Sequence, residues 1–142
     1  MFAKLQTFRL SLFIYELTLS DFENYLNGLL SQIKDSIKII EELKDNSGDL
    51  EIIKKELAKI NGLFQVIVNK LNLIDNRSDK YVQLFSAARF YLENYSFERE
   101  IETMSKLYSN DSHRLKNIRY LILKSLTDKK LIEKVDSIME KL

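Results

Sequence analysis

Residues 50–74 read LEIIKKELAKINGLFQVIVNKLNLI and carry the most regular pattern in the sequence. Their apolar residues recur at alternating steps of three and four, at Leu50, Ile53, Leu57, Ile60, Phe64, Ile67, Leu71 and Ile74. This spacing places one apolar side chain per turn along a single helical face. Its average period favours packing against a second helix at a shallow angle. The stretch therefore predicts a long helix that needs a helical partner.

The residues immediately before this stretch provide such a partner. Ser20 and Glu23 form a capping box, which predicts that a helix begins there. An apolar stripe then runs from Phe22 to Leu43, and the turn Asp45–Gly48 follows it. A short connection makes antiparallel packing within the chain cheaper than association of two chains. We therefore expect a long antiparallel helical hairpin over residues 20–74.

The other segments also have helical periodicity. Residues 2–17 predict a separate first helix, and residues 112–126 predict a helix near the end of the chain. Residues 79–109 fit either one kinked helix or two helices. The last helix is expected to carry the stripe Leu131, Val135, Ile138 and Leu142. The sequence thus predicts one all-α domain over residues 1–142, a compact bundle of six or seven helices around the hairpin.

Composition limits the classes of function. The chain has no proline, three glycines and no cysteine, so disulfides, thiolate nucleophiles and sulfur-ligated metals are excluded. The absence of cysteine favours a cytoplasmic location. A net charge of +1 gives no general attraction to nucleic acid or acidic lipid. The apolar segment Ser11–Leu19 contains Glu16 and is shorter than the ~20 residues of a membrane span, so we expect no membrane partner.

Residues suited to catalysis or metal binding are few. The only histidine, His113, follows Asn110 at the third position, which excludes the Glu-x-x-His ligand pair of di-iron helical bundles. Residues 41–45, with Glu41, Glu42 and Asp45, resemble the first half of the acidic Mg²⁺ motif of nucleotide pyrophosphohydrolases. The second half of that motif is missing from its expected position. We therefore expect a solvated acidic helix end, with no catalytic residue, metal or cofactor.

One local concentration of charge stands out. The predicted helix between Ser112 and Thr127 contains four basic residues and no acidic one. Cations interleaved with an aromatic residue suit contact with a phosphate backbone and stacking on bases. The alternative is a solvated helix whose lysines keep the protein soluble. The candidate nucleic-acid-binding residues are His113, Arg114, Lys116, Arg119, Tyr120 and Lys124.

Two functional hypotheses follow. The first is a non-catalytic helical-bundle protein that acts through protein–protein interaction, by self-association or as a subunit of a larger complex. Apolar residues outside the main stripe support it because they need a second surface to cover them, namely Ile52, Leu63, Val66 and Leu73. The second is a small subunit that contacts RNA or single-stranded nucleic acid through residues 113–124. In size, helix content and basic surface, the chain resembles the small helical subunits of CRISPR effector complexes, although no motif carries that likeness.

Overall fold

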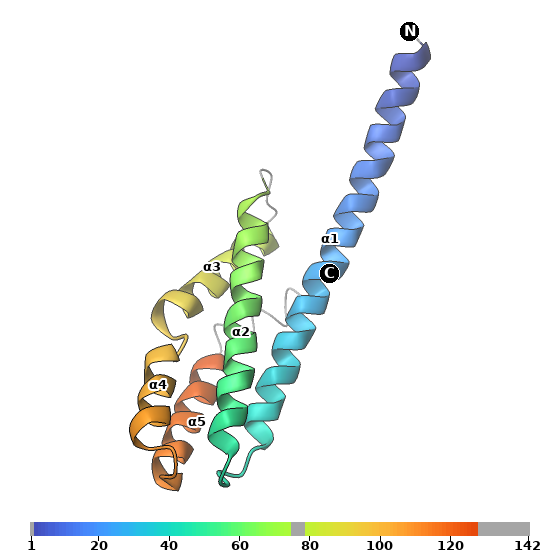
Figure 1. Ribbon diagram of the computed structural model, residues 1–142. Helices are drawn as coiled ribbons and strands as arrows, with labels where there is room; N and C mark the ends of the chain where they lie inside the picture. The colour runs from blue at the N-terminus through green and yellow to red at the C-terminus, as the bar shows by residue number, and fades with distance from the viewer. Residues whose placement is uncertain (1, 75–78, 128–142) are drawn as a thin grey trace.

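The structure, a computed structural model, describes residues 2–74 and 79–127, with side chains from Asp21 to Leu126 in these ranges. All regular structure within these ranges is α-helical, which confirms the predicted fold class. The five described helices are α1 (Phe2–Glu42), α2 (Asp49–Asn72), α3 (Asp79–Asn94), α4 (Glu98–Leu107) and α5 (Ser112–Thr127), and Figure 1 shows their arrangement.

The C-terminal half of α1 lies beside α2, and the two helices run in opposite directions (Figure 1). Gly48 precedes α2 with a φ of 93°, a left-handed backbone conformation that costs glycine little. The apolar stripe that begins at Leu50 is buried through Leu71. It faces a core to which α1 contributes Leu26, Leu29, Leu30, Ile33, Ile37 and Ile40.

The expected helix boundary at Ser20 is wrong, because α1 is continuous from Phe2 to Glu42. A capping box marks the start of a new helix only where the N-cap residue leaves the helical conformation. No proline or glycine lies between Phe2 and Tyr25, so nothing in this segment interrupts the backbone hydrogen bonds of the helix. The two helices predicted on either side of Ser20 are therefore one, and the described residues contain five helices. The stripe Leu131, Val135, Ile138 and Leu142 lies outside them.

The segment 79–109 forms two helices, α3 and α4. They are separated at Ser96 and Phe97, whose φ values of 33° and 60° are left-handed. The amide of Asn61 on α2 donates through Nδ2 to the Ser96 carbonyl at 2.9 Å, and its Oδ1 accepts a 2.9 Å hydrogen bond from the Tyr91 hydroxyl. The corner between α3 and α4 is thus tied to the middle of α2 by one buried amide.

The helices differ greatly in length, and this sets the shape of the molecule. With 41 residues in α1 and 24 in α2, the two helices are about 60 Å and 36 Å long at 1.5 Å per residue. Figure 1 shows α5 near the C-terminal end of α1 and α4 next to α5, whereas the N-terminal half of α1 extends beyond the other described helices. We call residues 2–20 of α1 the arm.

Candidate functional site

Helix α5 carries the residues that the sequence analysis selected for nucleic-acid binding. Its start is capped by Asp111, whose Oδ1 accepts hydrogen bonds of 3.1 Å from the backbone N–H groups of His113 and Arg114. The opposite face of the helix is buried at Leu115, Ile118, Ile122 and Leu126. The apolar spacing of α5 therefore decides which polar residues face solvent.

Arg119 is engaged within the protein. Its Nε donates to Asp45 Oδ1 at 2.7 Å, and its Nη2 donates to Asp45 Oδ2 at 3.0 Å. The two side chains are only 17% and 16% exposed. The hydrogen bonds from Arg119 hold the pKa of Asp45 below its usual value, and the charge of Lys116 contributes to this effect. Arg119 therefore fastens α5 to the connection between α1 and α2.

Removing this ion pair should destabilise the fold. We expect Asp45→Asn to lower the free energy of unfolding at pH 7 by about 1.5–3 kcal/mol, the range for hydrogen bonds to charged groups. Because folding lowers the pKa of Asp45, the contribution is present above the unfolded pKa of about 3.8 and is lost as the pH falls through the folded pKa. Urea denaturation of both proteins at pH 7 and pH 3 measures this difference, which should shrink at pH 3.

The matched control is Lys106→Met, which removes the fully exposed pair between Lys106 Nζ and Glu102 Oε1 at 2.8 Å. Solvent screens such pairs, so its loss should be much smaller. Equal losses in the two variants, or a difference for Asp45→Asn that is unchanged at pH 3, would contradict a structural role for the Asp45–Arg119 pair.

Arg114 has local partners. Its guanidinium carbon lies 3.6 Å from the centre of the Tyr108 ring, and its Nε lies 3.4 Å from Asp111 Oδ2. This cation–π contact joins α5 to the end of α4. The side chain is still 52% exposed, so Arg114 remains accessible to solvent.

The remaining four predicted residues share the outer face of α5. His113, Lys116 and Lys124 are exposed, and the Tyr120 side chain is 62% exposed. They follow one another at helical spacing, and no acidic residue occurs in α5. We call His113, Lys116, Tyr120 and Lys124 the outer stripe. The structure thus places four of the six candidates on the outer stripe, leaves Arg114 half-exposed beside its local partners, and engages Arg119 within the protein.

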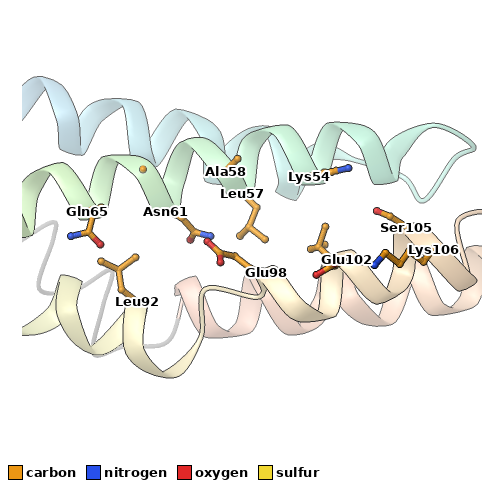
Figure 2. Close-up of a pocket in the computed structure, with 12 residues that line it drawn as sticks. Lys54, Leu57, Ala58, Asn61, Gln65, Leu92, Glu98, Glu102, Ser105 and Lys106 are labelled. Atoms are coloured by element: carbon orange, nitrogen blue, oxygen red, sulfur yellow. Dashed lines mark hydrogen bonds and ion pairs between the residues drawn. The ribbon is translucent and has the colours of Figure 1, made fainter.

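A groove that the sequence did not reveal lies between α2 and the α3–α4 segment (Figure 2). It has a volume of about 750 Å³, and Leu57 and Ile101 contribute buried apolar side chains to its lining. Figure 2 shows Gln65 and Leu92 at one end, with a charged cluster of Lys54, Glu102 and Lys106 at the other. The groove forms between residues 54–65 and residues 92–106, which are distant in the sequence, so no local sequence pattern could have indicated it.

The chemistry available in the described residues is limited. Ser105 lines the groove, and its hydroxyl is buried without a hydrogen-bond partner, but the only histidine lies on the exposed face of α5. Within residues 2–74 and 79–127, no group of three or more histidine, aspartate or glutamate side chains could hold a metal ion. Of the acidic residues at the end of α1, Glu41 and Glu42 are exposed, while Asp45 is bound to Arg119.

The apolar residues outside the main stripe have different environments. Leu63 and Val66 are half-buried and pack against the core. Ile52 is 39% exposed and Leu73 is 77% exposed. Of these four side chains, only Ile52 and Leu73 are therefore exposed on the surface.

Comparisons with protein-family models, curated proteins and solved structures found no match to this chain. In the described part of the chain, no helix is both long enough and apolar enough to cross a membrane.

Proposed function

We propose that this protein is a cytoplasmic, non-catalytic helical module that forms one domain and works by binding another protein, either a second copy of itself or another subunit of a complex. The observation that carries the proposal is the excess length of α1 over α2, 41 residues against 24. The C-terminal half of α1 packs against α2, and the arm extends beyond the other described helices (Figure 1).

The apolar register of α1 supports this role. In the packed half, Leu26, Leu29 and Ile33 are buried against the core. In the sequence, the same steps of three and four continue backward without interruption through Phe22, Leu19, Tyr15, Leu12, Phe8 and Leu5. A sustained 3.5-residue repeat favours packing against another helix. Since helices in proteins are stabilised mostly by packing of their apolar face, an arm with this pattern calls for a partner.

Site-specific photo-crosslinking in the native host tests the proposal. We expect a photoreactive amino acid at Leu12, in the arm, to give a discrete covalent adduct with another protein chain. The same amino acid at Lys55, which lies on the exposed face of α2, is the control and should give none. Denaturing gels and mass spectrometry identify the adducts. Absence of an adduct at Leu12, or equal adducts at the two positions, would contradict the proposal.

The exposed outer stripe of α5 favours a second candidate function, contact with RNA or single-stranded DNA. Two lysines, a histidine and a 62%-exposed tyrosine occupy this stripe, and α5 lacks acidic residues that would repel phosphate. Lysine contacts to phosphate release counterions and give binding that weakens with salt. Tyrosine can stack on an unpaired base. A small helical subunit that contacts nucleic acid within a larger complex would use this surface.

A charge-reversal experiment tests this second function. We expect Lys116→Glu with Lys124→Glu to abolish retention of single-stranded RNA and DNA at low salt. The control, Lys38→Glu with Lys55→Glu, makes the same change in net charge on exposed positions of α1 and α2. Filter binding across a salt series measures both. If the outer-stripe variant and the control retain nucleic acid equally, the outer stripe is not the binding surface.

A further inference from the structure

We infer that the arm pairs with the arm of a second copy of this chain in antiparallel orientation. The inference rests on the proposed function and names its partner. Because α1 is one continuous helix, its heptad register can be followed from the packed half into the arm. Leu5, Leu12 and Leu19 occupy position a, and Phe8, Tyr15 and Phe22 occupy position d. In the sequence, the a and d register of the packed half thus continues into the arm.

The charges beside this apolar register select the orientation. Arg9 and Glu16 both occupy position e, and Lys4 occupies position g. In an antiparallel pair, e positions lie opposite e positions of the partner, so Arg9 of each copy meets Glu16 of the other. In a parallel pair, g positions lie opposite e positions of the next heptad, so Lys4 would meet Arg9. Antiparallel pairing therefore makes two attractive contacts, and parallel pairing makes two repulsive ones.

A second copy fits the arm better than an unrelated helix does, because the arm is complementary to itself. Its first half is basic, with Lys4 and Arg9, and Glu16 and Asp21 make the following segment acidic. The next acid, Glu23, is already bound by Lys80 and Tyr81 of α3. Reversing one copy places the basic half of each arm along the acidic segment of the other. Twofold symmetry of this kind closes the assembly at two chains.

Crosslinking with introduced cysteines tests the orientation, since the natural chain has no cysteine. Two single variants, Leu5→Cys and Leu19→Cys, carry different affinity tags and are treated with a short bismaleimide that spans about two helical turns, roughly 10 Å. We expect a crosslinked dimer in the mixture of the two variants and none in Leu5→Cys alone. A crosslinked dimer of Leu5→Cys alone would mean parallel arms and would overturn the inference.

Charge reversal supplies an independent readout. Arg9→Glu replaces two attractive contacts by two repulsive ones in the antiparallel dimer. We therefore expect the dissociation constant of the dimer, measured by sedimentation equilibrium at low salt, to increase about tenfold. Arg9→Glu combined with Glu16→Arg restores the opposite charges and should restore the wild-type dissociation constant. In a parallel dimer, Arg9→Glu would face Lys4 and would tighten association, which is the opposite sign.

The oligomeric state and the photo-adduct at Leu12 together distinguish pairing of two arms from binding of the arm to another protein. A chain that stays monomeric at all concentrations, and whose photo-adduct at Leu12 contains a foreign protein, would overturn self-pairing and leave the binding role of the arm in place. A monomeric chain without any adduct at Leu12 would overturn both.

Discussion

Replacing Ile60 with glutamate is expected to unfold the protein. Ile60 is fully buried in the centre of the α2 stripe. The substitution loses about 1.5–3 kcal/mol of apolar burial, and an unpaired buried carboxylate costs several kcal/mol more. The total is comparable with the whole stability of a small domain, about 5–15 kcal/mol. Far-ultraviolet circular dichroism and urea denaturation measure the loss of helix and of a cooperative transition.

Two further variants make this result specific. Gln65→Glu adds the same charge at an exposed position of α2 and should leave the helical signal and the unfolding midpoint nearly unchanged. Ile60→Val removes one methylene group and should cost about 0.5–1.5 kcal/mol. A wild-type spectrum and a wild-type transition for Ile60→Glu would show that the α1–α2 interface is not the core of the fold.

Tyr91→Ala should cause the second-largest loss, about 3–5 kcal/mol, the range for truncating a buried aromatic residue. Tyr91 is 1% exposed, its ring centre lies 5.0 Å from that of Phe64, and its hydroxyl donates to Asn61. Tyr91→Phe keeps the ring and leaves the Asn61 oxygen unpaired, so it should cost about 1–3 kcal/mol. Urea denaturation of the two variants separates ring packing from the hydrogen bond. Equal losses would contradict this separation.

The same tyrosine should shape the response to alkali. Burial, with a contribution from the charge of Glu98, raises the pKa of Tyr91 above its usual value. The unfolded chain therefore releases this proton first, so stability is complete below about pH 10 and declines as the pH rises. Burial and the Glu23 hydrogen bond likewise raise the pKa of Tyr81 to about 12. Tyr91→Phe should consequently show a shallower loss of stability between pH 10 and 12 than the wild-type protein.

Much of the fold could be predicted because its main signal is periodic and local. The alternating steps from Leu50 to Leu71 identify residues that are all buried, and the spacing in α5 correctly separates Leu115 and Ile118 from the solvent-facing outer stripe. The helix boundary at Ser20 was wrong because a capping pattern is only a preference. It has little effect in a segment that contains no helix breaker.

The candidate site was less predictable because its decisive contacts are distant in the sequence. Arg119 and Asp45 are 74 positions apart, so the sequence of α5 alone did not show that Arg119 is bound to Asp45. Arg119 was therefore counted among the residues available to nucleic acid. Asn61 lies next to the apolar stripe of α2 in the sequence, and it joins Tyr91 to the Ser96 carbonyl across 30 and 35 positions. Single-residue patterns do not encode such pairings, which depend on the arrangement of the helices.

The position of α5 affects what an assembly of this protein could bind. Figure 1 shows α5 beside the C-terminal end of α1, remote from the arm. A dimer joined through its arms would therefore present two identical copies of the outer stripe at opposite extremities of an elongated particle. Such a particle could span two separated segments of one long ligand, and a short ligand could occupy only one end at a time. Its binding strength would then increase with ligand length even though every individual contact stayed the same.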